Sequence, residues 1–183
     1  MIYMFLAEGF EEIEALCPLD LMRRAGLSVT TVGIGGEYVT GAHAITVRAD
    51  ITDRDFYAHS AQNDTKMIFL PGGMPGTLNL GTSEVVSDAI RSAYEDGKYI
   101  AAICAAPSIL GKMGLLLGKE AICYPGFEDQ LEGATISDKH LVLDGNILTA
   151  AGMGVALDMG LEIVRIFCGA EKANALRSAV IAD

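Results

Sequence analysis

The sequence has little positive charge: 13 lysines and arginines stand against 24 aspartates and glutamates, for a formal net charge of -11 over 183 residues. So acidic a surface repels polyanions, and we expect neither nucleic acid nor an anionic membrane among its partners. No apolar run is long enough to span a bilayer, and the apolar start MIYMFLA has no basic residues before EGFEEIE follows. We therefore expect no signal peptide and a cytoplasmic location.

Cysteine and histidine are also sparse. The cysteines are Cys17, Cys104, Cys123 and Cys168, and the histidines are His43, His59 and His140. No two cysteines form a CxxC pair, so we expect free thiols rather than a zinc knuckle. The histidines are widely separated, so we expect no metal site. The segment GIGGEY lacks the last glycine of GxGxxG, and we expect no nucleotide or other cofactor.

Apolar residues are abundant, at 51%. They gather in short runs typical of strands: IYMFLA, SVTTVGI, KMIFLPGG, YIAAIC and NILTAAG. Helical spacing predicts helices at 11–26, at 82–97 with Thr82 as the N-cap, at 154–169 and at 170–183. Residues 35–50 have the pattern of a small hairpin outside the main sheet. Strands alternating with helices predict an α/β fold, a mostly parallel sheet covered on both faces, in a single domain spanning 1–183.

Cys104 stands where the apolar run YIAAIC changes into AAPSILGKMG, which is typical of a helix. Ligands bind at the carboxyl ends of parallel strands, and a thiol beside a helix N-terminus faces N–H groups that stabilise an anion. We therefore predict that the pKa of Cys104 is lowered and that its thiolate attacks carbonyls or peroxides. The alternative is an inert buried cysteine, because free cysteine is commonly buried.

The segment FLPGGMPG supplies a second candidate loop. Gly72 and Gly73 permit a sharp turn and let backbone N–H groups face a neighbouring pocket. The N–H groups of Gly73 and Ala105 are candidates for an oxyanion hole. An ordinary turn between strand and helix is the alternative interpretation.

The segment AEGFEEIEA supplies a candidate acid. Glu11 and Glu12 are typical of favourable charges in a first helical turn, whereas Glu14 is placed to point toward the strand ends. A carboxyl group buried beside a thiolate has a raised pKa. Glu14 is therefore predicted to donate a hydrogen bond to the sulfur or to carry a proton.

Four segments in this order, GFEEIEALCPLDLMRRAG, LPGGMPGTLNL, ICAAPSILG and ILTAAG, resemble the DJ-1 branch of the DJ-1/PfpI superfamily. The resemblance covers essentially the whole chain. It implies a flavodoxin-like three-layer α/β/α sandwich that is usually a homodimer. It also implies that Glu14 contacts Cys104 and that Gly73 and Ala105 form the anion pocket.

The resemblance implies a role in stress defence. Members of the family are described as cofactor-free glyoxalases, deglycases, chaperones and oxidative-stress sensors. For this chain it implies that Cys104 attacks a small reactive carbonyl such as methylglyoxal and that Glu14 relays a proton. The alternative is a non-enzymatic redox sensor or chaperone-like dimer in which peroxide oxidises Cys104 to sulfinate.

Several positions depart from relatives. Tyr124 stands in the pocket where many have histidine, and a phenol is a poor general base at neutral pH. Ala105 replaces the histidine of the protease-like branch, so we expect no peptidase. Ala151 stands where eukaryotic members carry a pocket arginine, which leaves the substrate range open. His140 is followed two residues later by Val142 rather than glutamate, so we expect no glutamine amidotransferase.

Overall fold

The computed structural model describes residues 1–182, so the last residue of the helix predicted at 170–183 lies outside the described residues. Seven strands form one sheet in the order β10-β11-β7-β6-β1-β2-β5. Their bounds are β1 (Ile2–Leu6), β2 (Val29–Gly33), β5 (Ile51–Thr52), β6 (Met67–Leu70), β7 (Tyr99–Ile103), β10 (Leu141–Asp144) and β11 (Ile147–Ala150). All neighbours pair in parallel except β10 and β11. The predicted mostly parallel sheet is confirmed.

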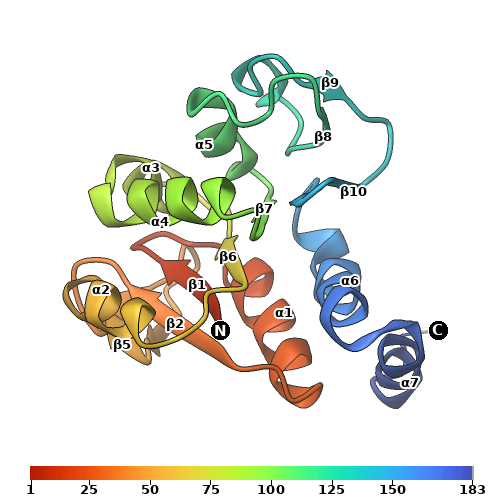
Figure 1. Ribbon diagram of the computed structural model, residues 1–183, viewed down its shortest axis with the longest axis horizontal. Coiled ribbons are helices and arrows are strands. Elements are labelled where there is room, and N and C mark those ends of the chain that lie inside the picture. The colour runs from red at the N-terminus through yellow and green to blue at the C-terminus, as the bar shows by residue number, and fades with distance from the viewer. Residues whose placement is uncertain (183) are drawn as a thin grey trace.

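Helices cover both faces of the sheet, which makes the molecule a three-layer sandwich (Figure 1). One face packs against α2 (Asp53–Ala61), α3 (Gly76–Thr82), α4 (Glu84–Glu95) and α5 (Pro107–Lys112). The other packs against α1 (Glu12–Arg24) and α6 (Ala156–Cys168), and α7 (Ala170–Ala179) lies against α6. Because successive strand residues point to opposite faces, Tyr3 and Phe5 enter one core while Met4 enters the other.

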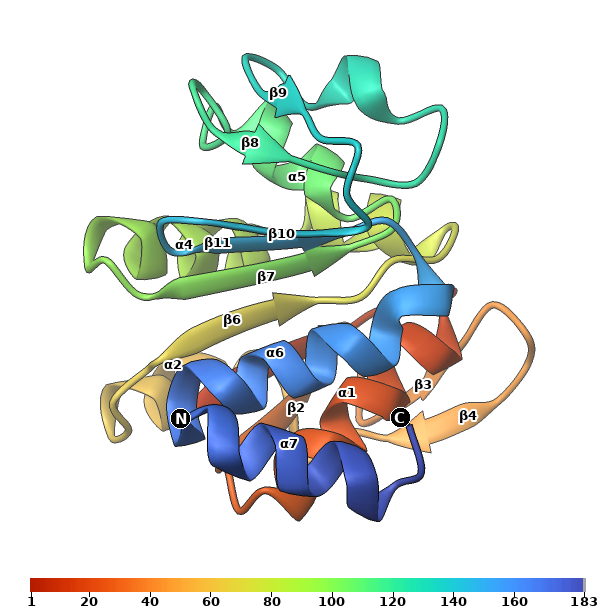
Figure 2. The same ribbon diagram turned by 90° about the vertical axis from the view of Figure 1, so that its right-hand side faces the viewer.

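Two small pairs of strands lie outside this sheet. The strands β3 (Tyr38–Thr40) and β4 (Thr46–Arg48) form the predicted antiparallel hairpin. The strands β8 (Glu120–Ala121) and β9 (Thr135–Ile136) pair in parallel beside α5, above the main sheet in Figure 2. Short 3-10 helices occupy Glu128–Gln130 and Met153–Val155.

The expected N-cap at Thr82 is wrong. Thr82 is the last residue of α3, and its hydroxyl donates to the carbonyls of Leu78 and Asn79 rather than capping the next helix. Ser83 is the N-cap of α4. The proline and glycines of this stretch indicated a loop, which hid α3 from the sequence analysis.

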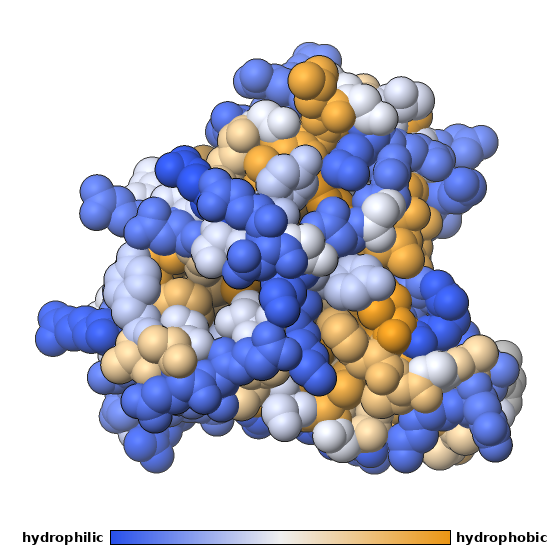
Figure 3. All heavy atoms as spheres, in the orientation of Figure 1, coloured by the Kyte–Doolittle hydropathy of each residue, from blue (hydrophilic) through white to orange (hydrophobic). Residues whose placement is uncertain are grey.

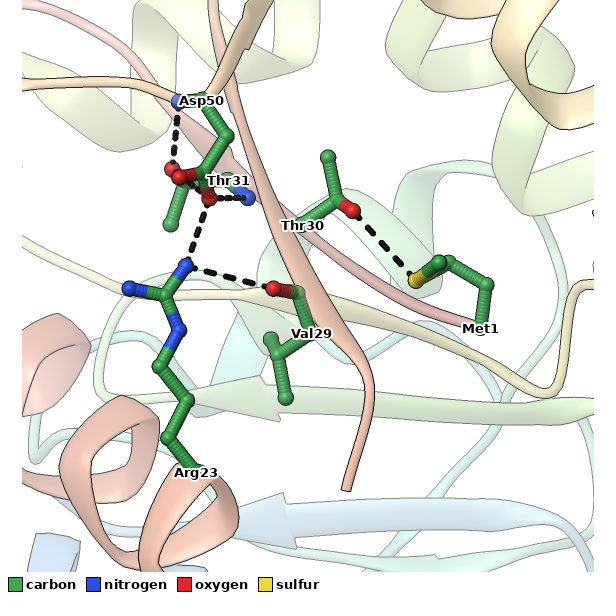
Figure 4. A network of polar contacts seen from close by, with 6 residues as sticks. All are labelled: Met1, Arg23, Val29, Thr30, Thr31 and Asp50. Atoms are coloured by element: carbon green, nitrogen blue, oxygen red, sulfur yellow. Dashed lines mark hydrogen bonds and ion pairs between the residues drawn. The ribbon is translucent and has the colours of Figure 1, made fainter. Parts of the chain in front are cut away.

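The carboxyl-terminal end of α1 is tied to the sheet by a polar network (Figure 4). Arg23 lies 2.6 Å from an Asp50 oxygen, which also accepts hydrogen bonds of 2.8 Å from the Thr31 N–H and hydroxyl. Burial alone raises the pKa of Asp50, but these donors outweigh it and hold that pKa below its usual value. The network therefore fixes α1 in position relative to β2.

Apolar and hydrophilic side chains are unevenly distributed on the face seen in Figure 3. Hydrophilic side chains dominate the side of α2 and α4, whereas apolar ones gather along the junction of α1 and α6. Within residues 1–182, every helix is too short or too polar to cross a membrane.

Candidate functional site

Cys104 occupies the first position after β7, at the carboxyl edge of the sheet. Its φ of 64° lies in the left-handed region, which for a residue with a Cβ typically costs about 1–3 kcal/mol. Hydrogen bonds hold this conformation: the Cys104 N–H donates to the Ala150 carbonyl at 2.9 Å, and the Tyr124 N–H donates to the Cys104 carbonyl at 2.8 Å. The half-buried thiol therefore projects from a strained turn between strand and helix.

Glu14 reaches the same point from the first turns of α1. It is 1% exposed, its carboxyl group is hydrogen-bonded to the Cys104 thiol, and the Gly72 N–H donates to Oε2 at 3.0 Å. Burial raises the pKa of Glu14 to about 7, and hydrogen bonds from Cys104, Gly72 and the Met153 N–H offset only part of that rise. The carboxyl group can therefore gain or lose a proton near neutral pH.

Gly72 allows the acid and the thiol to meet. A Cβ placed there would lie 2.6 Å from the Cys104 Cβ and 2.6 Å from Glu14 Oε2. Both separations are far inside van der Waals contact, so a larger residue would displace one group or the other. The lack of a side chain at Gly72 is therefore what allows Glu14 and Cys104 to lie close together.

The backbone N–H groups of Gly73 and Ala105 favour the charged form of the Cys104 thiol. Gly73 has a φ of +91°, and a Cβ there would lie 2.3 Å from the Glu11 nitrogen. The Thr77 N–H donates to the Gly73 carbonyl at 2.9 Å, which ties this loop to α3. The structure thus brings together the two candidate oxyanion-hole residues and the thiol.

The predicted lowering of the Cys104 pKa is wrong while Glu14 is ionised. Burial, the Glu14 charge and the hydrogen bond to Glu14 raise the thiol pKa to about 12, and the N–H groups of Gly73 and Ala105 oppose this only in part. The local sequence pattern indicates the N–H groups, whereas the burial of the thiol and the charge of Glu14 arise from distant segments. When Glu14 holds the proton, the repulsion vanishes and its O–H donates to the sulfur. Burial, the largest of these causes, still raises the thiol pKa in that state, so a thiolate is favoured here only when Glu14 is protonated.

Tyr124 lies at the mouth of the site, with half of its surface exposed. Its ring flanks Gly152, where a Cβ would lie 3.3 Å from Tyr124 Cδ2 and 3.9 Å from Glu14 Oε1. Sequence reasoning missed Met153, whose N–H reaches Glu14. Gly152 and Gly154, which flank Met153 after the last apolar run, are the only feature of the sequence that indicates a close approach of the backbone there.

The remaining cysteines do not join the site. Cys123 is buried in the core on the α2–α5 face, whereas Cys104 packs against the core of the opposite face. Burial raises the pKa of Cys123 to about 11. Cys17 is half-buried and Cys168 is exposed.

The structure thus places a cysteine at a strained turn beside a buried carboxyl group in an α/β sandwich. The DJ-1/PfpI family model matches residues 1–166. Protein dj-1beta of Drosophila melanogaster is 38% identical over 170 residues, covering 91% of this chain and 89% of its own. The chain belongs to the DJ-1/PfpI family.

Solved structures agree with this assignment. The crystal structure of Drosophila melanogaster DJ-1beta matches with a TM-score of 0.90 at 35% identity, over 98% of this chain and 96% of that one. Oxidized Toxoplasma gondii DJ-1 matches with a TM-score of 0.91 at 28% identity, over 98% and 97%. The flavodoxin-like sandwich expected from the resemblance is confirmed. The glutathione-independent glyoxalase DJR-1.2 of Caenorhabditis elegans is 30% identical over 172 residues, covering 92% of this chain and 89% of its own.

Proposed function

We propose that the protein is a cofactor-free glyoxalase that converts small 2-oxoaldehydes to 2-hydroxy acids. The observation that carries the proposal is the hydrogen-bonded pair of Cys104 and Glu14, in which the carboxyl group has a pKa of about 7. One group supplies a nucleophile and the other moves protons at neutral pH. The similarity to a protein named as a glutathione-independent glyoxalase supports the same chemistry.

The first step is the attack of Cys104 on the aldehyde. The thiol proton passes to Glu14, and Sγ forms a bond to the aldehyde carbon while the C=O π electrons move to oxygen. We assign the stabilisation of this oxyanion to the N–H groups of Gly73 and Ala105, which favour negative charge on the sulfur. Return of the proton from Glu14 to the oxygen gives a neutral hemithioacetal.

The second step moves a proton between neighbouring carbons. Ionised Glu14 removes the hydrogen from the carbon bonded to Sγ, which gives an enediolate. The remaining hydroxyl proton passes to the neighbouring oxygen, and Glu14 returns its proton to the adjacent carbon. The product is a 2-hydroxyacyl thioester of Cys104. Water then cleaves the carbon–sulfur bond, which releases the 2-hydroxy acid and restores the thiol. Overall the aldehyde gains one water and no external oxidant is required.

Lactate formation from methylglyoxal tests this proposal. We expect steady-state turnover by the wild type and none by Cys104→Ala. Cys168→Ala is the matched control, because it removes an exposed thiol at the end of α6, which is not part of the Cys104 site. If the wild type forms lactate no faster than Cys104→Ala, the glyoxalase proposal fails.

A redox sensor is the second candidate, in which peroxide oxidises Cys104 to sulfinate. The partial exposure of this thiol and the similarity to a DJ-1 structure described as oxidized favour it. Mass spectrometry after peroxide treatment tests it. Stoichiometric sulfinate at Cys104 without lactate turnover would favour the sensor.

A homodimer, which the family resemblance implies, is a separate proposal. The Ile13 side chain is 49% exposed on α1, and apolar side chains gather where α1 meets α6 (Figure 3). Such a surface suits contact between two copies. Light scattering behind size-exclusion chromatography gives the molar mass, and a mass equal to one chain of 19.3 kDa would contradict the dimer.

A further inference from the structure

Three metal-ligating groups converge on one point of the surface beside the amino-terminal end of α1. His43 Nδ1 lies 3.0 Å from Glu12 Oε2 and 3.5 Å from Glu11 Oε2. One ligand atom from each residue lies within 4.8 Å of the others. His43 comes from the loop between β3 and β4, so the set joins two separate segments of the chain.

The Glu12 carboxylate is held in place by the backbone of that loop. Its Oε1 accepts hydrogen bonds from the His43 N–H at 2.8 Å and the Ile45 N–H at 3.4 Å. Gly41 leaves the necessary room, because a Cβ there would lie 2.4 Å from Glu12 Cδ. With Oε1 occupied, Oε2 is directed toward His43. Hydrogen bonds of this kind hold a metal-binding side chain in its orientation.

The negative charges of Glu11 and Glu12 are only partly neutralised by neighbouring side chains. Among residues 1–182, the only cationic partner of Glu11 and Glu12 is His43. Even a protonated imidazole leaves a net charge of about -1 across one cation and two carboxylates. The glutamate side chains are 14% and 6% exposed, whereas His43 is 69% exposed. The site is thus anionic, with its carboxylates sheltered and one side open to solvent.

We propose that this cluster binds a divalent transition-metal ion of the zinc class. Imidazole nitrogen with carboxylate oxygen suits zinc, whereas magnesium and calcium prefer oxygen alone. Tetrahedral bonds of about 2.0–2.1 Å place neighbouring donors about 3.3–3.4 Å apart, and the two separations from His43 Nδ1 bracket that value. Zinc takes the place of the Nδ1 proton, and water completes the tetrahedron from the open side.

The proposed metal site is separate from the thiol site. The two sites are nevertheless neighbours. The Glu11 N–H donates to the carbonyl of Gly72, the residue beside Cys104 and Glu14, at 2.9 Å. No step of the proposed reaction uses the ion. The spacing of histidine and cysteine in the sequence does not indicate this cluster, because two of its three residues are glutamates.

Calorimetric titration with zinc chloride tests the site in the full chain carrying Cys104→Ala and Cys168→Ala, which removes the catalytic thiol and the exposed one. We expect one zinc per chain. Adding His43→Ala should weaken binding at least about 100-fold, because loss of an outer contact alone typically costs 10–100-fold. His140→Ala removes another exposed histidine and should leave binding unchanged.

Two further measurements remove the remaining ambiguity. Glu12→Gln keeps the shape of the side chain and should also abolish stoichiometric binding. Zinc should shift the imidazole NMR signals of His43 and leave those of His59 and His140 in place. Absence of saturable binding, or stoichiometric binding that survives His43→Ala, would overturn the proposal. Because neither readout involves turnover, the result is independent of the proposed glyoxalase activity.

Discussion

Glu12 and Glu14 lie two residues apart on α1 and both expose little of their surface, at 5% and 1%, yet their pKa values move in opposite directions. Burial raises the pKa of both. At Glu12, hydrogen bonds from backbone N–H groups and from His43 outweigh burial and lower the pKa. At Glu14, the same opposing effects are too small, and the pKa reaches about 7.

Glu14 lies deeper in the protein than Glu12, so burial raises its pKa further, and the two carboxyl groups also have different partners. Glu12 faces N–H groups and an imidazole that favour its charge, so it stays ionised and holds the hairpin loop. Glu14 faces a thiol that can itself become an anion. A group in that position exchanges its proton with its neighbour.

Glu14→Gln should produce the largest effect. Turnover should fall by about 10²–10⁴-fold, because proton transfer by a positioned side chain is worth that much. The pKa of Cys104 should fall at the same time, since the charge of Glu14 contributes to raising it. The pH dependence of iodoacetamide alkylation reports the thiol, and lactate formation reports the turnover. If Glu14→Gln formed lactate as fast as the wild type, Glu14 would not be the group that transfers the proton.

The same substitution should change the pH dependence of folding. The folded pKa of Glu14, about 7, is above the reference value of 4.5, so folding takes up a proton between these values. Wild-type stability therefore decreases as the pH rises through that window. Glu14→Gln should be more stable than the wild type by about 3 kcal/mol at pH 8, since one pKa unit is worth about 1.4 kcal/mol.

Urea unfolding at two pH values measures this gain. Near pH 4 both versions carry a neutral side chain at this position, so the difference should vanish. An equal gain at both pH values would mean that the removed charge is not its cause.

Gly72→Ala tests whether the pairing of Glu14 and Cys104 requires a missing side chain. The added methyl group should destabilise the protein by about 1–3 kcal/mol, as overpacking does, and should reduce turnover by separating the pair. Gly36→Ala is the matched control, because a Cβ there meets nothing within 4 Å. Thermal unfolding and lactate formation distinguish the two effects. Unchanged activity in a folded Gly72→Ala protein would contradict the proposed geometry.

The sequence predicted the elements that carry a regular apolar pattern. The buried strands, the hairpin at 35–50 and the long helices of the α1 face have clear periodicity, and the structure contains them. The helix α3 was missed because Pro75 and Gly76 indicate a turn, although both are tolerated at the start of a helix. The position of Cys104 was foreseen because a strand pattern changes to a helix pattern at that residue.

Contacts between distant segments could not be predicted in the same way. The pKa of Cys104 depends on how closely Glu14 approaches, and that distance is set by Gly72 from a third segment. The role of Glu12 depends on the hairpin loop that carries His43. A local pattern describes neither, because each arises only when the chain has folded.

Glu12→Gln should produce the smallest effect, in the opposite direction to that of Glu14→Gln. Its lowered pKa means that the ionised form stabilises the fold above about pH 4.5, and that this contribution is lost as the pH falls through the folded pKa. The variant should therefore lose about 1.5 kcal/mol near pH 7, the lower end of the range typical of hydrogen bonds to charged groups, and less in acid. Urea unfolding at pH 7 and pH 3 measures both. A gain in stability at pH 7, as expected for Glu14→Gln, would show that the two carboxylates are alike.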